Sequence, residues 1–396
     1  MICENWQQLL YATKITLTVC TALLLGVGLE EFTELGANYE LISIGSFEHP
    51  ESIARQYGIQ MKDYPLLLAL DPFLVKPRKN ATEHKMLPNL TALHWPPKVV
   101  ASRPAGSVYE NGTTAPLPRP FEPIMSNGQI NLSRRLLKLF SDLMFEHGYG
   151  DRFWLNGGSL VGSYHHHNFI PWDDDVDVLA DVELRPEIQR LLKTLEPEYK
   201  TYSMYVRDKL FSETINQSQA HLDLEYSRAT SNNPWSWPFL DIGYCRIEPV
   251  KTCEDPWIPG LSVCYPTSSI FPLIYRPFGD DWYPSPSNVP VYLRSMYREH
   301  TSCVTFGYSH ILESGSRFGR VPCHTLLHRY PFVRHLTLPG SQVVARNNSI
   351  AQLFTVDMEQ LSKRSDYKWD MIHTLRLPIQ RENVVQCIGY GVPEPR

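Results

Sequence analysis

The chain has 396 residues, of which 43% are hydrophobic and 20% are charged, and its formal net charge is −5 at pH 7. This length allows one large domain or two smaller ones, with a sizeable buried core. The acidic balance offers no basic field for the backbone of a nucleic acid, which argues against nucleic acid as the main partner.

A nearly unbroken apolar segment covers residues 9–29. Its length is close to the roughly 20 residues that a helix needs to cross a bilayer. Lys14 lies near its start and acidic residues follow it directly, which favours a cytoplasmic N-terminus. We therefore expect residues 1–29 to form a type II signal-anchor, with the rest of the chain in the lumen. A cleaved signal peptide is the first alternative, because the small residues 26–28 would suit a cleavage site, and a buried soluble helix is the second.

Two residue patterns after this segment agree with a secretory chain. Six N-x-[ST] glycosylation sequons follow the apolar segment, at Asn80, Asn89, Asn111, Asn131, Asn216 and Asn347. Six cysteines also follow it, which allows up to three disulfides in an oxidising compartment. Proximity in sequence predicts the pairs Cys253–Cys264 and Cys303–Cys323. A zinc site is the alternative, but no CxxC spacing supports it. We expect a Golgi or ER membrane location.

Composition divides the remaining chain into three parts. Residues 30–75 mix apolar runs with polar breaks and are predicted to form a small stem element. Frequent prolines interrupt residues 76–125, which also contain three sequons, so we interpret this part as an exposed, glycosylated linker. Residues 126–396 are predicted to form the catalytic domain.

Helical and strand patterns alternate through the first half of this domain. The segment 131–148 has a helical apolar face with Leu132, Leu136, Leu139, Phe140, Leu143 and Met144. A short strand follows, then a Gly-Gly-Ser turn and a short helix, a strand through "FIPWDDDVDVLA", and a helix that begins near Pro186. Further strands are predicted at 199–206, 221–226 and 237–247, and irregular structure after residue 250. The pattern indicates an α/β or α+β fold with a mixed sheet and flanking helices.

The stretch "SYHHHNFIPWDDDVDV", residues 163–178, contains the strongest chemical signal. In an extended strand Asp175 and Asp177 project from the same face, and Asp173 has the same parity. Two such carboxylates about 4 Å apart repel by about 4 kcal/mol at an effective dielectric constant of about 20. A divalent cation removes this repulsion, and ligands that are all oxygen favour Mg²⁺ or Mn²⁺. The alternative is a solvated acidic turn, but the apolar flanks favour a metal site.

The three preceding histidines are weaker metal-ligand candidates. Consecutive side chains cannot all face one ion, and no H-E-x-x-H spacing is present. We therefore expect His165, His166 and His167 to line a turn or contact substrate.

Other residues complete the candidate site. Asp241, a lone acid within the apolar run "PFLDIGY", is the best candidate for a third carboxylate, and Asp223 is the runner-up. Asp241 or Asp177 could accept the proton of an attacking hydroxyl. Gly157, Gly158 and Ser159 lie at a strand-to-helix turn, where backbone N–H groups can bind phosphate.

The run "WLNGGSLVGSYHHHNFIPWDDDVDV" together with "FLDIGYC" resembles the signature of the LicD/fukutin family. The resemblance covers residues 130–245 and implies a nucleotidyltransferase-like fold. Members of that family transfer phosphocholine or a phosphopolyol, such as ribitol phosphate, from a CDP-linked donor to a sugar hydroxyl. Animal members are anchored in the Golgi or ER membrane and are preceded by a stem, which agrees with the anchor predicted from the N-terminus.

Carried over residue by residue, the resemblance assigns Asp173, Asp175 and Asp177 to the metal strand, Asp241 to the third acid, and Gly158 and Ser159 to the phosphate turn. It implies Mg²⁺ or Mn²⁺ as cofactor, a CDP-linked donor and a glycan acceptor. His165 departs from the family, which commonly has arginine there, so its role as a donor contact is open. Arg207 and Lys209 are alternative basic contacts.

Two other functions remain open from the sequence. The chain could be a catalytically inactive luminal protein that keeps the fold to bind glycans or to act as a scaffold. A hydrolase with a metal held by histidines is the weaker alternative.

Overall fold

A seven-stranded mixed sheet forms the centre of the computed structural model. The structure describes residues 70–106, 115–230, 233–255, 262–297, 302–305, 307–347, 350–365 and 368–380, all within one unit, Pro50–Arg396. The strand order is β1-β2-β7-β4-β3, and β8 and β9 continue from β7. The bounds of these strands are β1 (Phe153–Leu155), β2 (Val176–Asp181), β3 (Tyr199–Ser203), β4 (Arg207–Ser212), β7 (Phe239–Ile247), β8 (Lys251–Glu254) and β9 (Cys264–Pro266).

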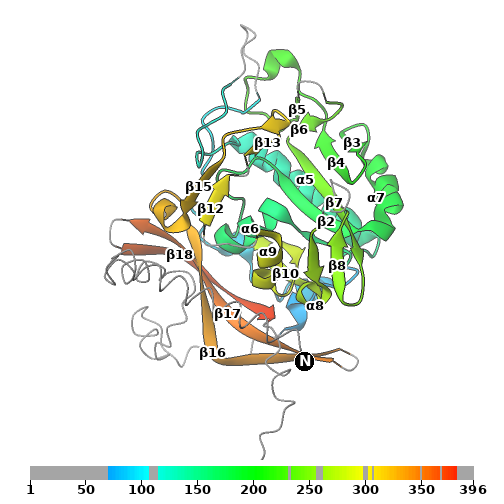
Figure 1. The fold of residues 1–396 in the computed structure, drawn as a ribbon, viewed down its shortest axis with the longest axis vertical. Helices are drawn as coiled ribbons and strands as arrows, with labels where there is room; N and C mark the ends of the chain where they lie inside the picture. Colours follow the sequence, from blue (N-terminus) through cyan, green and yellow to red (C-terminus); the bar gives the residue numbers. More distant parts are fainter. Residues whose placement is uncertain are drawn as a thin grey trace, which may run out of the picture. The chain divides into compact units, whose positions relative to one another are not determined.

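Within this sheet β2 and β7 pair in parallel, whereas the other described pairs are antiparallel. The parallel pair lies at the centre of the sheet. It places Asp177 and Asp241, each near the N-terminal end of an apolar strand, next to each other. Both strands are buried along most of their length, with Val178, Leu179, Leu240 and Ile242 fully inaccessible to solvent. The predicted mixed α/β sheet is therefore confirmed (Figure 1).

Helices pack against this sheet, with α5 (Asn127–Glu146) lying against β4 and β7 and α6 (Gly157–His166) lying against β2. Ser126 begins α5 through a reciprocal capping box with Gln129. Its predicted apolar face is buried at Leu132, Leu136, Phe140 and Met144. The other helices are α4 (Ala81–His84), α7 (Arg185–Leu192), α8 (Thr267–Ile270) and α9 (Val289–Tyr297), with 3-10 turns η2 (Asp71–Phe73), η3 (Leu90–Ala92), η4 (Val182–Leu184), η5 (Lys193–Leu195), η6 (Gln217–Gln219) and η7 (Cys323–Leu326).

The part of the chain after residue 250 contains more regular structure than we predicted. Three long antiparallel strands, β16, β17 and β18, form a separate sheet (Figure 1). The signal was present in β18, where Leu375, Leu377 and Ile379 alternate as buried residues. The remaining strands are β5 (Arg228–Ala229), β6 (Ser236–Trp237), β10 (Ile274–Phe278), β11 (Asp281–Ser285), β12 (Ser302–Thr305), β13 (Tyr308–Ser309), β14 (Ser314–Gly315), β15 (Gly319–Pro322), β16 (Phe332–Asn347), β17 (Ile350–Ser365) and β18 (Lys368–Gln380).

The described part of segment 76–125 is packed against the domain, which corrects the prediction of an exposed linker. Leu87, Leu90 and Met125 belong to the main hydrophobic core and are at most 6% exposed. The prolines misled the prediction, because they exclude long helices but do not prevent the apolar side chains between them from packing closely. The sequon residues Asn80 and Asn89 nevertheless remain exposed, each at the start of a short helical turn.

The two disulfides predicted from proximity, Cys253–Cys264 and Cys303–Cys323, are both formed. Cys245 is buried with a free thiol, and Cys387 lies outside the described residues. The predicted anchor, residues 1–29, and residues 30–69 of the predicted stem also lie outside them. In the part that the structure describes, no helix is long and apolar enough to cross a membrane.

Candidate metal and phosphate site

Three carboxylates converge where β2 and β7 begin to pair. Asp177 and Asp241 are direct partners in the parallel register, so their side chains project from the same face of the sheet. Asp175 precedes β2, and one ligand oxygen from each of the three residues lies within 4.8 Å of the others. The sequence motif and the distant "FLDIGY" run are thus brought together at one site.

One buried oxygen in this group has no hydrogen-bond partner. Asp241 is 5% exposed, and its Oδ1 atom accepts no hydrogen bond from any described residue. Its Oδ2 atom lies 3.4 Å from a guanidinium nitrogen of Arg207 and 3.7 Å from Nζ of Lys209. Because buried carboxylate oxygens are normally satisfied, this vacant acceptor fits a cation ligand. The oxygen-only donor set fits a hard divalent ion such as Mg²⁺ or Mn²⁺.

The raised pKa values of these acids show that it is unfavourable to hold them together in their charged form. Burial, with the neighbouring charge of Asp175, raises the pKa of Asp173 and of Asp177 well above the usual value for aspartate. Burial also raises the pKa of Asp175 to about 6, although His310 opposes the shift. Negative charge is therefore in excess here, and a bound cation would relieve it.

Asp173 and Asp175 do not extend β2 as predicted, because the strand begins at Val176. The chain turns before it at Pro171 and Trp172. Trp172 donates its indole N–H to the carbonyl of Val304 and packs in a separate core cluster. This anchoring turns the chain away from the sheet, so Asp173 lies in a loop beside Gly158. The predicted ligand Asp173 is therefore not in either group of described residues that could hold a metal.

The first turn of α6 lies directly against these carboxylates. A Cβ on Gly158 would lie 2.1 Å from Oδ2 of Asp173, and a Cβ on Gly157 would lie 2.6 Å from Oδ2 of Asp177. Gly157 also has a φ of 52°, which most other residues adopt only with strain. The hydroxyl of Ser159 accepts a hydrogen bond from the backbone N–H of Asp177. The predicted turn thus places a positive helix end beside the acidic group, as a phosphate site requires.

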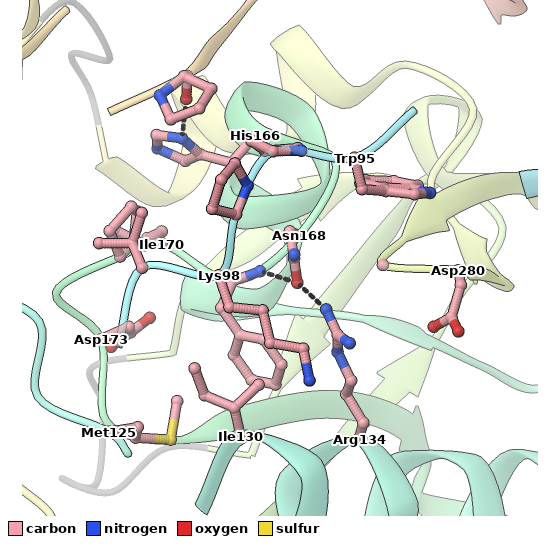
Figure 2. Close-up of a pocket in the computed structure, with 17 residues that line it drawn as sticks. Trp95, Lys98, Met125, Ile130, Arg134, His166, Asn168, Ile170, Asp173 and Asp280 are labelled. Atoms are coloured by element: carbon pink, nitrogen blue, oxygen red, sulfur yellow. Dashed lines mark hydrogen bonds between the residues drawn. The ribbon is translucent and has the colours of Figure 1, made fainter. Parts of the chain in front are cut away.

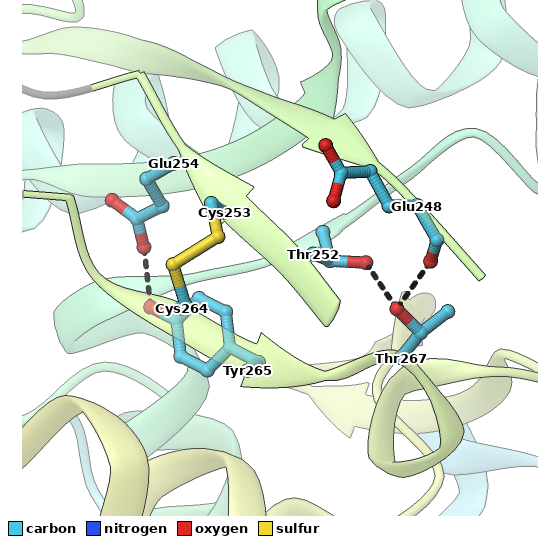
Figure 3. Close-up of a disulfide and its surroundings, with 7 residues drawn as sticks. All are labelled: Glu248, Thr252, Cys253, Glu254, Cys264, Tyr265 and Thr267. Atoms are coloured by element: carbon cyan, nitrogen blue, oxygen red, sulfur yellow. Dashed lines mark hydrogen bonds between the residues drawn. A yellow bond between two sulfur atoms is a disulfide. The ribbon is translucent and has the colours of Figure 1, made fainter. Parts of the chain in front are cut away.

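The residue before this turn is held by groups from β8 and α9. Asn156 is the N-cap residue of α6, but its side chain accepts from the hydroxyl of Tyr292 and donates to Glu254, not to the helix. Tyr265 donates its hydroxyl to the same Glu254 carboxylate. Figure 3 shows Glu254 and Tyr265 beside the Cys253–Cys264 disulfide, which joins the two strands. The Asn156 side chain therefore does not cap α6, and the backbone N–H groups of its first turn can bind another partner.

Two cations on β4 lie along the same face. Lys209 is the register partner of Asp241, and its side chain is 3% exposed. Its ammonium lies 3.4 Å from the ring centroid of Phe239 and 3.9 Å from Glu313. The pKa of Arg207 is lowered by burial, but the carboxylates of Asp241 and Asp177 outweigh this and raise it. Both basic residues balance part of the acidic charge. Because the Lys209 side chain is buried beside Asp241 and Glu313, it is less accessible than a residue that contacts the donor needs to be.

His310 is a site residue that sequence analysis missed. Its Nδ1 atom lies 2.7 Å from Oδ1 of Asp174, and its Nε2 atom lies 3.2 Å from Oδ2 of Asp175. These three residues form a second group that could hold a metal. Burial lowers the pKa of His310, but the adjacent carboxylates of Asp175 and Asp174 raise it well above its usual value. No local motif marks this histidine, because the contact joins residues 136 positions apart.

The histidine run lies at the other end of α6. His166 contacts the carbonyl of Pro331, and His167 contacts Glu359 and His373. His165, in the last turn of the helix, has its ring 5.0 Å from that of Tyr164. The run therefore packs against the C-terminal strands, as expected of residues that line a turn. The donor contact proposed for His165 is not part of the geometry around the N-terminal turn.

Asp223, the alternative third acid, has a structural position. Its carboxylate accepts from the hydroxyl of Ser126 and from the backbone N–H of Gly128 at the start of α5. The predicted strand at 221–226 is wrong, because these residues form turns that bring Asp223 to the helix. The aromatic residues Trp235 and Trp237, which precede the strand with Asp241, are buried in the main core.

Two cavities meet at Asp173. One, of about 260 Å³, is lined by residues that include Trp95, Lys98, Arg134 and Asn168 (Figure 2). The other, of about 510 Å³, reaches Asp174 and His310 as well as Asp173. A ligand in either cavity can therefore approach the acidic group.

Comparison with known proteins gives three findings. Residues 150–288 match the family model described as "LicD/FKTN/FKRP, nucleotidyltransferase domain". The chain is 29% identical over 89 residues to the lipopolysaccharide cholinephosphotransferase LicD of Haemophilus influenzae, which covers 22% of this chain and 32% of that protein. The chain thus spans about a third of the length of this curated relative. A lincomycin-bound lincosamide adenylyltransferase, LnuA, aligns over 43% of this chain and 88% of its own, with 15% identity and a TM-score of 0.25.

Proposed function

Because residues 150–288 match the family model of the LicD/FKTN/FKRP nucleotidyltransferase domain, we propose that the protein is a metal-dependent phosphotransferase. Its substrate would be a CDP-linked donor of phosphocholine or of a phosphopolyol such as ribitol phosphate, and its acceptor would be a glycan hydroxyl. The family description and the mixed sheet support a nucleotidyltransferase-like fold. The observation that carries the proposal is the group Asp175, Asp177 and Asp241, with an unsatisfied Asp241 oxygen beside the first turn of α6.

The chemistry assigned to this site is displacement at phosphorus. The acceptor hydroxyl oxygen forms a bond to the phosphorus of the transferred group, the bond from that phosphorus to CMP breaks, and CMP leaves with the electron pair. Asp177 or Asp241 takes the hydroxyl proton. When bound to these acids, Mg²⁺ or Mn²⁺ would supply positive charge that neutralises the phosphate oxygens. The N-terminal turn of α6 orients the phosphate through its backbone N–H groups.

The larger cavity provides room for the donor. Its volume of about 510 Å³ lies in the range that accommodates a small organic ligand. Arg119 and Arg317 line it together with Tyr308, so positive charge and an aromatic ring are available for a diphosphate and a base. The cavity reaches the acidic group at Asp173 and Asp174.

We place this site on the luminal side of a Golgi or ER membrane. The two disulfides support an oxidising compartment, and the exposed sequon residues Asn80, Asn89 and Asn216 are accessible for glycosylation. The expected anchor in residues 1–29 would keep the enzyme at the membrane. A shift in gel mobility after enzymatic removal of N-glycans checks this placement, and its absence would contradict luminal exposure of those residues.

The test of the function is CMP release from a panel of CDP-linked donors by the purified full-length protein, with and without Mg²⁺ or Mn²⁺. We expect metal-dependent release from one donor, and loss of that release in Asp175→Asn. Asp223→Asn is the matched control, because this aspartate caps α5 outside the acidic group. Absence of release from every donor, with metal binding intact, would favour a glycan-binding or scaffold protein instead.

A further inference from the structure

About half of the smaller cavity that includes Asp173 is built from parts of the chain outside the family domain. Trp95, Lys98, Ile130 and Arg134 line it, and all four precede residue 150. The family domain contributes Asp173, His166 and residues 168–171, 279 and 280. In Figure 2, Asp173 lies at the left of the drawn set and Trp95 at the upper right, with Asn168 between them. The cavity therefore extends from Asp173, which lies in the family domain, to a wall formed by residues outside that domain.

Basic and acidic side chains occur in equal number around this cavity. Lys98 and Arg134 are the basic residues of its lining, and Asp173 and Asp280 are the acidic ones. Burial lowers the pKa of His166 to about 4, so this residue is neutral near pH 7. A ligand with a phosphate or carboxylate group would meet Asp173 at the inner end and Asp280 at the exposed mouth. A lining in which hydrogen-bond donors and acceptors alternate, with carboxyl groups at Asp173 and Asp280, favours a neutral, polyhydroxylated ligand over an anion.

One wall of the cavity is a fixed aromatic ring. The indole N–H of Trp95 donates to the carbonyl of Leu90 at 2.9 Å, and the ring packs edge-to-face on His373 with centroids 4.7 Å apart. Trp95 is only half-buried, so part of the indole remains open to the cavity. A ring held in this way can pack against the C–H face of a sugar without losing conformational freedom on binding.

Polar groups lie across from this ring. The carbonyl oxygen of the Asn168 side chain accepts from Arg134 at 2.9 Å, which orients the amide. The Nε atom of Arg134 is buried and has no hydrogen-bond partner among the described residues. Asp280 adds a carboxylate that can accept hydroxyl protons. Donors and acceptors are thus distributed around an apolar floor that includes Met125 and Ile130.

We propose that this cavity is the acceptor subsite and binds one neutral sugar residue of the glycan, stacked on Trp95, with a hydroxyl directed toward Asp173. The inference rests on the proposed function. A volume of about 260 Å³ is below the range typical of drug-sized ligands, which fits a single sugar ring. The donor and the acceptor then approach the acidic group from two cavities, as displacement at phosphorus requires. Acceptor choice is set by Trp95, Lys98, Ile130 and Arg134, which lie outside the family domain.

The test is sugar binding to the full-length protein, measured by saturation-transfer NMR and calorimetry without any donor. The probes are methyl glycosides of neutral hexoses and pentoses, compared with glucuronic acid and hexose 6-phosphates. We expect millimolar binding of at least one neutral glycoside, and at least tenfold weaker binding of its anionic counterparts. Equal or tighter binding of the anionic sugars, or no binding of any glycoside, would overturn the proposal.

Variants at the ring make the test specific. Trp95→Ala should weaken sugar binding at least tenfold, whereas Trp95→Phe, which keeps an aromatic surface, should weaken it less than threefold. Tyr205→Ala is the matched control, because Tyr205 is 89% exposed and does not line the cavity. Wild-type binding by a folded Trp95→Ala protein, checked by its melting curve, would overturn the assignment. Sugar binding without CMP release would contradict the proposed function alone, and CMP release without sugar binding would contradict this subsite alone.

Discussion

The two ends of α6 both contact buried carboxylates, but the charges there are arranged in opposite ways. At the N-terminal end, three basic side chains, Arg207, Lys209 and His310, face five acids, Asp173, Asp174, Asp175, Asp177 and Asp241, and the pKa values of Asp173, Asp175 and Asp177 are raised. At the C-terminal end, a single acid, Glu359, is fully buried and forms two hydrogen bonds of 2.7 and 2.9 Å with Arg276. Burial alone would raise the pKa of Glu359, but Arg276 and the neighbouring histidines lower it well below its usual value.

The difference separates structure from function. The charge of Glu359 is neutralised by its bidentate guanidinium partner, and the role of this carboxylate is to hold β10, β17 and the end of α6 together. At the N-terminal end the carboxylates outnumber the basic groups, so their charge needs a cation from outside the protein. The same helix therefore has a satisfied end that fixes it and an unsatisfied end that is available for a ligand.

The largest effect is expected from the unsatisfied oxygen. Asp241→Asn removes the charge of the central acid while keeping its shape. We expect CMP release to fall about a thousandfold, which corresponds to about 4 kcal/mol of transition-state stabilisation. Steady-state kinetics at saturating metal measures this loss. A decrease of less than tenfold would mean that Asp241 is not part of the reacting site.

The two ends should respond to neutralisation with opposite signs. Glu359→Gln leaves Arg276 buried without its carboxylate and should reduce the free energy of unfolding by about 3–5 kcal/mol. Asp173→Asn removes repulsion and should raise the melting temperature of the metal-free protein. Glu187→Gln, which breaks an exposed pair with Arg190, is the control and should leave the melting temperature unchanged. If Asp173→Asn destabilised the metal-free protein as Glu359→Gln does, the contrast between the two ends would be wrong.

Alanine substitutions at two glycines of α6 should also distinguish the role of its N-terminal end from that of its C-terminal end. In Gly158→Ala the new methyl group would collide with Asp173, so we expect metal affinity to fall about 10- to 100-fold. In Gly162→Ala it would lie 2.3 Å from the backbone oxygen of Asn168, so stability should fall instead. Mn²⁺ titration and thermal unfolding of both variants measure this. Equal metal affinity in Gly158→Ala and the wild type would show that the close approach does not matter.

The smallest expected effect is that of pH. Because folding raises the pKa of Asp175 to about 6, its contribution to the stability of the metal-free protein is present at low pH and is lost as pH rises through about 6. Metal binding reverses this, so Mg²⁺ should raise the melting temperature more at pH 7.5 than at pH 5. At pH 5 about a tenth of this carboxyl is ionised, which predicts affinity about tenfold weaker than at pH 7. Equal stabilisation at both pH values would contradict the shift.

Sequence patterns predicted the part of the site that is local in the chain. The turn 157–159, the acids of residues 173–177 and the lone Asp241 all lie in short motifs, and the parallel register of β2 and β7 brings them together. Strand periodicity also indicated the mixed sheet. The close pairs Cys253–Cys264 and Cys303–Cys323 followed from proximity in the same way.

What could not be predicted depends on contacts between distant segments. His310 reaches Asp174 from 136 residues away, and nothing in its neighbourhood marks it. Trp95 lies in a proline-rich segment that composition assigns to a linker, although its indole faces a cavity. The position of His165 follows from the length of α6, which separates its last turn from its first. Only tertiary packing brings these residues to their places.

The most direct test of the central claim is calorimetric titration of the metal-free full-length protein with Mn²⁺ at pH 7.5, in parallel with Asp175→Asn and Asp241→Asn. We predict saturable binding in the wild type, displaceable by Mg²⁺, and binding weakened at least tenfold in both variants. Absence of binding in the wild type, or equal affinity in all three proteins, would show that the carboxylates at the N-terminal end of α6 are not held together for a cation.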